Sequence, residues 1–189
     1  MAFYRLRNKK WSPFFTNSTN RFEEAVFYKG HFYAVDDIGV LRRLLFDIDS
    51  NSYEEEVVSV DIGGNTSYRY LVESSSSCGG VTMMVVRRFD FERGKTELFE
   101  IFKLDWSNGN WEEVSNLGDQ ALFLAHCDSK LVSVSLDNPE YRQNTIYFID
   151  DVFAEDFGMY NLGNRYFEPL KIPSSHMRHP FCGWIQPAA

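Results

Sequence analysis

The sequence has few cysteines and no long hydrophobic run. Its three cysteines, Cys78, Cys127 and Cys182, form no C-x-x-C pair. An odd number of scattered cysteines is typical of reduced thiols, so we expect an intracellular protein of the cytoplasm or nucleus without a disulfide framework. No apolar run approaches the ~20 residues of a membrane-spanning helix, and the first residues lack the apolar region of a secretory signal. We therefore expect no membrane partner.

Positive charge is also scarce. The chain has 19 Lys and Arg against 27 Asp and Glu, which gives a formal net charge of −8. Because binding to duplex nucleic acid depends on neutralising phosphates with Lys and Arg, we expect no nucleic-acid partner. The one basic cluster is formed by Arg5, Arg7, Lys9 and Lys10, next to Trp11. We interpret it as a solvated strand and turn, with contact to an acidic partner as the alternative.

Motifs of catalysis and metal binding are missing. The chain has no G-x-S-x-G, H-E-x-x-H, G-x-G-x-x-G or P-loop pattern. A calcium-loop pattern starts at Asp47 and then fails, because its sixth position is Ser52 instead of Gly and its twelfth is Val58 instead of Glu. We predict no catalytic residue, no cofactor and no metal site, and hence a protein that is not an enzyme.

One carboxylate cluster leaves an enzymatic alternative open. Asp150, Asp151, Glu155 and Asp156 are the densest group of acids. A hydrolase could use Asp150, Asp151 and Asp156 as an acid/base set, and the same side chains could hold a cation. Aspartates in such segments more often cap turns, which is the interpretation that we favour.

Three further groups have donor atoms but lack the context of a site. His176, His179 and Cys182 are of the types that bind zinc, but only three ligands are local and the surrounding prolines indicate an extended segment. The neighbours His126 and Cys127 would point to opposite faces of a strand, so they form no dyad with each other. The stretch Ser74–Gly80 lacks the strand-then-helix setting of a phosphate-binding loop, and we predict a flexible hairpin loop there.

Aromatic residues, in contrast, are abundant. They make up 16% of the chain, and aromatic enrichment favours strands over helices. With 44% hydrophobic residues the composition is that of a globular protein. No sustained stretch shows the periodicity of an amphipathic helix. The sequence therefore predicts an all-β fold.

A repeat organises these strands. Residues 45–58 contain an apolar strand, an Asp, a polar turn, an aromatic residue, an acidic pair and a valine, and residues 101–114 repeat that order. Residues 159–170 and 3–14 are more degenerate copies. Each copy predicts a β-hairpin, and Asn108-Gly109 indicates a two-residue type I′ turn in one of them.

The aromatic anchors of the four copies have the spacing of propeller blades. They are Trp11, Tyr53, Trp111 and Phe167, which lie 42, 58 and 56 residues apart. A four-stranded blade takes about 40–50 residues. A β-sandwich is the alternative, but it would not repeat the Asp–turn–aromatic unit.

Further strands are expected between the hairpins. The expected segments are residues 27–35 with a turn at Lys29-Gly30, residues 68–73 and 81–89 as a hairpin, and residues 121–124, 131–136 and 145–149. We predict an incomplete β-propeller with about three to four blades of antiparallel strands in an open arc. The partial propeller domain would span residues 1–173, and residues 174–189 would form an extended C-terminal tail that pairs with a blade.

Taken in order, several segments resemble one known family. The segments are Tyr28–Asp36 with Gly39 and Leu41, Tyr70–Ser74, Phe102–Asp105, Trp111–Val114, Leu117–Leu124, Asn144–Asp151, and Pro180–Trp184 with Pro187. Together they resemble the KIB-type β-propeller domain of plant F-box proteins, over essentially the whole chain. Two features depart from the family pattern. The F-box region and earlier propeller strands do not precede the match, and Ala125 stands where a glycine is usual.

The resemblance implies a function in protein binding. Members of the family resemble substrate receptors of SCF-type ubiquitin ligases, in which the F-box docks the ligase and the propeller holds the target. We expect this chain to be a protein-interaction module with an unidentified protein partner, bound by the concave surface or the loops of one face. Docking to the SCF ligase core is not expected without an F-box. The alternative is a truncated remnant with no partner of its own.

Three blades and part of a fourth cannot close a propeller ring at ordinary geometry. The end blades would then expose apolar faces and strand edges. We therefore expect marginal stability in solution, with self-association through exposed blade edges as a further outcome.

Overall fold

In the computed structural model, the strands of the described residues form a two-stranded, a four-stranded and a nine-stranded sheet, and the nine-stranded sheet consists of two blade-like parts. The structure describes residues 2–5, 9–13, 19, 21–63, 67–74, 80–125, 129–134, 141–149 and 156–169. Its strands are β1 (Ala2–Arg5), β2 (Lys10–Pro13), β3 (Phe22–Tyr28), β4 (His31–Asp36), β5 (Leu41–Asp47), β6 (Ser52–Val57), β7 (Ser67–Ser74), β8 (Gly80–Asp90), β9 (Lys95–Asp105), β10 (Asn110–Glu113), β11 (Gln120–Leu124), β12 (Lys130–Ser133), β13 (Thr145–Ile149), β14 (Phe157–Asn161) and β15 (Tyr166–Glu168). In this part of the chain no helix is long and apolar enough to cross a membrane. The predicted all-β class is confirmed.

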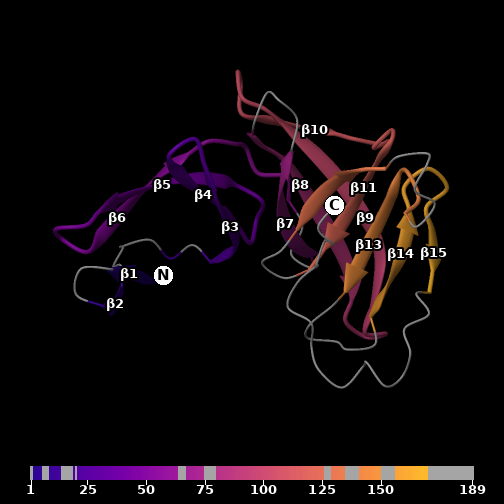
Figure 1. Cartoon of the computed structure of the whole chain (residues 1–189), viewed down its shortest axis with the longest axis horizontal. Helices are drawn as coiled ribbons and strands as arrows, with labels where there is room; N and C mark the ends of the chain where they lie inside the picture. The colour runs from indigo at the N-terminus through magenta and orange to yellow at the C-terminus, as the bar shows by residue number, and fades with distance from the viewer. Residues whose placement is uncertain are drawn as a thin grey trace.

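The strands follow one another in blade-like groups. β3–β4–β5–β6 form a four-stranded antiparallel sheet, which we call the first sheet. The next four strands pair in the same way, in the order β7–β8–β9–β10, and form the second sheet. β12–β11–β13–β14–β15 form the third sheet, and β1–β2 is a separate hairpin. In Figure 1 the first, second and third sheets follow one another from left to right without closing a ring.

All four predicted hairpins are present, and they share one register. In each, the aromatic anchor pairs with the residue seven positions before it. The pairs are Tyr4–Trp11, Phe46–Tyr53, Leu104–Trp111 and Tyr160–Phe167. The last loop residue has a positive φ in every copy: Lys9 50°, Asn51 53°, Gly109 72° and Arg165 54°. The repeat seen in the sequence is thus one hairpin used four times.

The loop geometry that the copies share explains why an Asp or Asn recurs at its start. The Asp105 carboxylate accepts hydrogen bonds from the Ser107 backbone N–H and hydroxyl, at 2.9 and 2.7 Å. Asp47 and Asn161 accept the equivalent backbone N–H two residues on, at 2.9 and 3.0 Å. These are Asx turns, in which a short side chain substitutes for backbone partners. Asp90 does the same between β8 and β9, a copy that the sequence analysis did not find.

The predicted type of one turn was wrong. Asp105 pairs with Asn110, so the β9–β10 loop has four residues and only Gly109 has a positive φ, whereas a type I′ turn needs two such residues. The Asp105 side chain binds the loop and thereby favours the longer turn. Lys29-Gly30 is the two-residue turn with positive φ at both positions, 45° and 82°, so the predicted turn in residues 27–35 is confirmed.

Alternating side chains pack the second sheet against both neighbours. On one face, Leu71, Met84, Val86 and Leu104 contact the first sheet through Tyr33, Val35 and Leu41. On the other, Tyr70, Val72, Val85, Phe99 and Ile101 contact residues of the third sheet such as Leu122, Ile146 and Tyr160. A strand buried on both faces must be apolar at successive positions, as Tyr70-Leu71-Val72 is. This stacking of sheet on sheet confirms the incomplete propeller.

The third sheet departs from the expected antiparallel blade. β11 pairs with β12 in the antiparallel direction but with β13 in parallel, and β12 meets β7 in parallel at one residue pair, Lys130 and Glu73. β12 takes one edge of β11, so β13 joins at the opposite edge. The parallel contact between β12 and β7 joins the second and third sheets into a nine-stranded sheet. The expected tail, residues 174–189, lies outside the described residues, so the domain limits remain predictions.

Candidate interaction surface

One face of the first sheet carries a ladder of aromatic side chains. Phe27 of β3 contacts Phe32 of β4 with ring centroids 4.8 Å apart, Phe32 contacts Phe46 of β5 at 5.4 Å, and Phe46 contacts Tyr53 of β6 at 5.6 Å. Register explains the ladder, because Phe27 pairs with Phe32 and Phe46 with Tyr53 across neighbouring strands. We call these four side chains the aromatic face.

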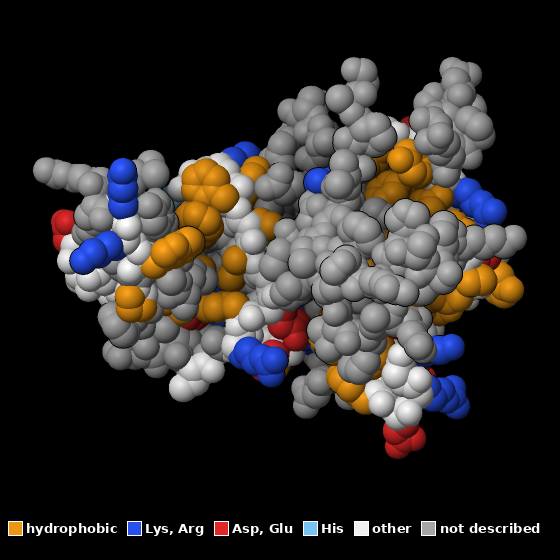
Figure 2. Space-filling view, turned by 60° about the horizontal axis from the view of Figure 1, so that its bottom comes forward, with side chains coloured by type: hydrophobic (Ala, Val, Ile, Leu, Met, Phe, Trp, Pro, Cys, Tyr) orange, Lys and Arg blue, Asp and Glu red, His pale blue; other side chains and the backbone are white. Residues whose placement is uncertain are grey.

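The aromatic face is partly exposed to solvent. Phe27 is 57% exposed and Phe32 43%, although Ala34 and Leu44 beside them are buried. Val57 lies on the same face of β6 and is exposed as well. Figure 2 shows a band of hydrophobic side chains across the left part of the molecule, where the first sheet and the β1–β2 hairpin lie in Figure 1. An exposed apolar patch of this kind is typical of an interaction site.

The aromatic face can be compared with the equivalent faces of the other two sheets, because the hairpin repeats in each. Phe46 and Tyr53 occupy the same hairpin positions as Leu104 and Trp111 in the second sheet and as Tyr160 and Phe167 in the third. Leu104 and Trp111 pack against the first sheet, and Tyr160 and Phe167 pack in the core between the second and third sheets. The aromatic face is therefore the third copy of a surface that contacts another sheet in its other two copies.

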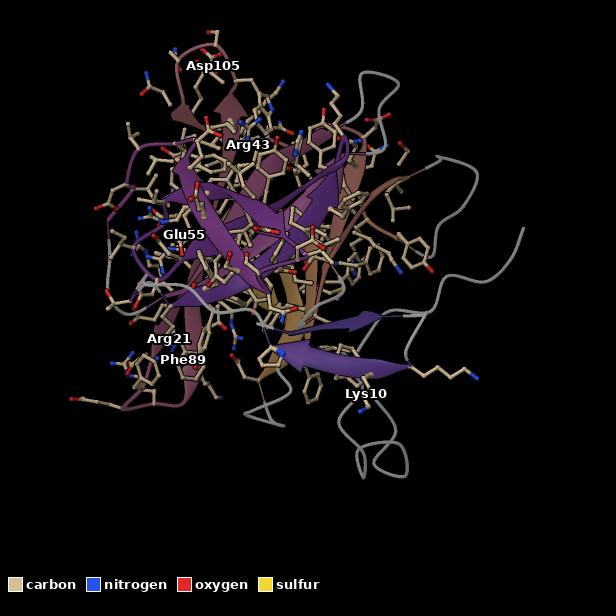
Figure 3. The ribbon with its side chains drawn as sticks, turned by 90° about the vertical axis from the view of Figure 1, so that its left-hand side faces the viewer. Lys10, Arg21, Arg43, Glu55, Phe89 and Asp105 are labelled. Carbon is tan, nitrogen blue, oxygen red and sulfur yellow. The ribbon has the colours of Figure 1, made fainter. Side chains whose placement is uncertain are left out.

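Charged residues lie on the same face of the first sheet, at the end away from the Lys29-Gly30 turn. The Arg42 guanidinium binds the buried Asp36 carboxylate at 3.0 Å and lies 3.7 Å from Glu55. Asp36 also accepts hydrogen bonds from the backbone of Val40, at 2.9 Å, and Ile38, at 3.3 Å, and so holds the turn after β4. Figure 3 looks onto this side of the molecule, with Glu55 on the sheet in front. The β1–β2 hairpin, labelled at Lys10, lies below the first sheet in both Figure 1 and Figure 3.

The turn end of the first sheet is hollowed. A depression of about 550 Å³ is bordered by Phe27, Phe32 and Phe46 and by the polar residues His31, Asp47 and Glu54. It is open to solvent and combines apolar and acidic walls. Such a surface suits a protein side chain better than a small molecule, which is usually enclosed on most sides.

Two glutamates of β3 tie the first sheet to the second. The Glu24 carboxylate accepts a hydrogen bond from the Leu71 backbone N–H at 2.8 Å, and Glu23 pairs with Arg69 at 3.3 Å. Burial raises the pKa of Glu24 to about 7, against the opposing effect of the Leu71 hydrogen bond. Burial also raises the pKa of Glu23, and the charge of Arg69 opposes that rise. These contacts position the first sheet and hence the aromatic face.

Asp156, proposed above as a hydrolase residue, is a structural partner. Its carboxylate forms a buried ion pair with Arg87 and accepts hydrogen bonds from the Thr96 backbone N–H and hydroxyl, at 3.0 and 2.6 Å. Arg87 also lies over the rings of Tyr68, Phe89 and Phe148. A carboxylate committed to these partners is not poised for proton transfer to a substrate.

The structure describes few of the remaining predicted candidates. Asp150, Asp151, Glu155, His126, Cys127, His176, His179 and Cys182 lie outside the described residues. Among the described residues, no three His, Cys, Asp or Glu side chains cluster as a metal site requires. The stretch from Asp47 forms the hairpin turn described above, and of the basic cluster Lys9 and Lys10 are exposed.

The aromatic face was not predicted from the sequence. Binding was expected on concave surfaces and loops, and Phe27 and Phe32 were predicted only as strand residues. A signal was present, since Phe27 and Phe32 flank the Lys29-Gly30 turn symmetrically and must pair across it. Which face of that hairpin would be exposed depends on distant sheets and could not be read locally.

Comparison with known proteins agrees with this architecture. Residues 1–161 match the family described as KIB1-4 beta-propeller. Relatives in Arabidopsis thaliana include an F-box/kelch-repeat protein, 27% identical over 79% of this chain and 40% of the relative. Two F-box proteins of the same organism are 29% and 28% identical, over 74% and 72% of this chain and 39% and 41% of their own lengths.

The chain spans about two fifths of the length of these relatives and matches their C-terminal part. No solved structure matches it.

Proposed function

The chain belongs to the KIB1-4 β-propeller family, and from that premise we propose that it is a protein-interaction module that binds a protein partner on its aromatic face. Propellers serve as binding platforms because a rigid stack of sheets presents one fixed surface. The relatives are F-box proteins by name, and the region they share with this chain is the propeller. We propose an intracellular, non-catalytic role for it.

The observation that carries the proposal is the exposure of Phe27 and Phe32. Two neighbouring phenylalanines exposed by about half would be unfavourable in solution, and contact with a partner would remove their apolar area from water. Aromatic side chains at the centre of a patch are also typical contributors to binding energy. The acidic residues Asp47 and Glu54 at its border add a polar rim.

Ligase docking is not part of the proposal. The relatives are named as F-box proteins, but the region in which this chain matches them is the propeller. The proposed role is therefore the holding of a partner, which the propeller could do in any assembly.

Affinity capture from plant extract tests the proposal. The tagged full chain is compared with Phe32→Glu and with Phe91→Glu, which changes a phenylalanine on the β8–β9 loop that is also exposed. We expect quantitative mass spectrometry to find specific partners that Phe32→Glu loses at least tenfold and Phe91→Glu retains. Recovery of chaperones alone, equally with all three chains, would favour a remnant without a partner and contradict the proposal.

A further inference from the structure

The two hairpins of the first sheet extend to different lengths at the Lys29-Gly30 end. The ladder between β4 and β5 stops at the Phe32–Leu44 pair. Beyond that pair the β3–β4 hairpin has one further residue pair, whereas the β5–β6 hairpin has three. The longer hairpin therefore extends past the turn of the shorter one. The depression of about 550 Å³ lies at this step, because residues of both hairpins line it.

Two phenylalanine rings form a corner in the depression. Phe27 and Phe32 both line it, with ring centroids 4.8 Å apart and ring planes inclined by 55°. Both side chains are exposed to solvent. The face of a phenyl ring attracts a cation, and the planar guanidinium of arginine can also stack on it. The aromatic walls therefore favour a cationic side chain over an acidic one.

The charged walls of the depression are acidic. Asp47 and Glu54 line it, and no Lys or Arg is among the described residues that do so. Hydrogen bonds from the Ser50 hydroxyl and from the backbone of the turn hold the pKa of Asp47 below its ordinary value, so this carboxylate stays charged. Glu55 and Glu56 pair with arginines of β5, whereas Glu54 forms no ion pair with a described residue. The depression thus complements positive charge.

The interior of the same chain holds an arginine with groups of these kinds. The Arg87 guanidinium lies over the rings of Phe89 and Phe148, 5.1 and 5.9 Å from their centroids. It also forms an ion pair with the Asp156 carboxylate. The depression presents the same combination, phenyl rings beside a carboxylate, at the surface.

We infer, on the basis of the proposed function, that the depression binds an arginine side chain of the protein partner. The guanidinium contacts the rings of Phe27 and Phe32 and donates hydrogen bonds to the Glu54 carboxylate. Solvent weakens both kinds of contact at an open site. An isolated arginine should therefore bind with a dissociation constant on the order of 1 mM, and the rest of the interface supplies the remaining affinity.

An NMR titration of the ¹⁵N-labelled full chain with N-acetyl-arginine amide tests the inference. We expect saturable shifts of the backbone amides in residues 27–32 and 44–54, with a midpoint of about 1 mM. The citrulline analogue has nearly the same shape but no charge, and the lysine analogue has the charge but no planar group. Each should bind at least about tenfold more weakly than the arginine probe.

Two glutamine variants locate the carboxylate contact. Glu54→Gln should raise the midpoint for the arginine probe at least about threefold, because it removes the charge of the acceptor. Glu112→Gln should leave the midpoint unchanged. Glu112 is the matched control, since it is exposed and holds the same hairpin position in the second sheet as Glu54 does in the first. The dispersion of the amide signals shows that each variant is folded.

Several outcomes would overturn the arginine contact. They are shifts spread over the whole chain, a citrulline or lysine analogue that binds as tightly as the arginine probe, and equal effects of Glu54→Gln and Glu112→Gln. Capture from plant extract separates this inference from the proposed function. Partners lost in Phe32→Glu but fully retained in Glu54→Gln would end the arginine contact and leave the proposed function standing. Partners retained in both variants would end both.

Discussion

Glu24 connects two sheets with a side chain that is protonated more readily than usual. Its folded-state pKa of about 7 lies above the ordinary 4.5, because burial disfavours the charged form. The folded chain therefore binds more protons than the unfolded chain between these values. The stability that comes from this group is fully present below about pH 4.5 and is lost as the pH rises through about 7.

We expect Glu24→Gln to remove this pH dependence. The amide oxygen can still accept the Leu71 N–H, and it carries no charge to desolvate. At pH 8 the variant should be more stable than the wild type by about 1–3 kcal/mol, and at pH 5 the difference should shrink. Urea unfolding at the two pH values measures it. Glu97→Gln, on the exposed surface of β9, is the control and should be neutral at both.

The Arg87–Asp156 pair should be far more important for stability than for any chemistry. Asp156→Asn leaves the Arg87 charge buried with one partner fewer, and breaking a buried pair typically costs about 3–5 kcal/mol. Urea unfolding should show a loss of that size. Glu168→Gln breaks the exposed pair with Arg142 and should cost less than about 1 kcal/mol. Equal effects of the two changes would mean that Asp156 is not structural.

At the scale of elements, the repeated hairpin also joins neighbouring sheets. The Gly109 carbonyl accepts a hydrogen bond from the Val60 N–H at 3.0 Å, and the Trp111 indole N–H donates one to the Ser59 hydroxyl at 2.9 Å. The loop of the second sheet thus holds the segment that leaves the first. Gly94 occupies the same loop position between β8 and β9 without such a neighbour.

Substitution of these two glycines distinguishes the energetic cost of a positive φ from the cost of a close steric contact. Both have a positive φ, which costs an L-residue about 1–2 kcal/mol. A Cβ on Gly109 would lie 2.6 Å from the Val58 carbonyl oxygen, whereas one on Gly94 would meet nothing within 4 Å. We expect Gly109→Ala to lower the free energy of unfolding by at least ~1 kcal/mol more than Gly94→Ala does. Similar urea midpoints for both variants would contradict the close contact.

Hairpins could be predicted from the sequence because their determinants are local. The polar loop and the aromatic anchor lie within twelve residues in every copy, an Asp or Asn precedes the loop in three of them, Arg5 takes its place in the copy at residues 3–14, and all four hairpins formed as expected. The parallel pairing of β11 with β13 could not be predicted, since it depends on which edge of β11 remains free. The type I′ turn at Asn108-Gly109 was wrong because the side chain of Asp105 selects a longer loop.

The candidate site was harder to predict than the fold. Asp156 looked like part of an acidic cluster, and only its distant partners Arg87 and Thr96 show its role. Phe27 and Phe32 were correctly placed on strands. Their exposure depends on how the sheets assemble, which is a property of the whole molecule.

For the whole molecule, we expect marginal stability that depends on concentration. An open stack of sheets buries less apolar area than a closed ring, so the melting temperature should lie at or below the ~45–65 °C of ordinary domains. Association stabilises the folded form by mass action, so the melting temperature should rise with protein concentration. Differential scanning fluorimetry with light scattering measures both. A monodisperse monomer with a high, concentration-independent melting temperature would contradict this expectation.

The proposed function requires that the aromatic face is the binding surface. Hydrogen–deuterium exchange with mass spectrometry, on the full chain alone at high dilution and in its complex, tests this claim directly. We predict slower exchange on binding in β3–β6, residues 22–57, and little change in β13 and β14. Protection of the third sheet with no change in residues 22–57 would contradict the proposed function.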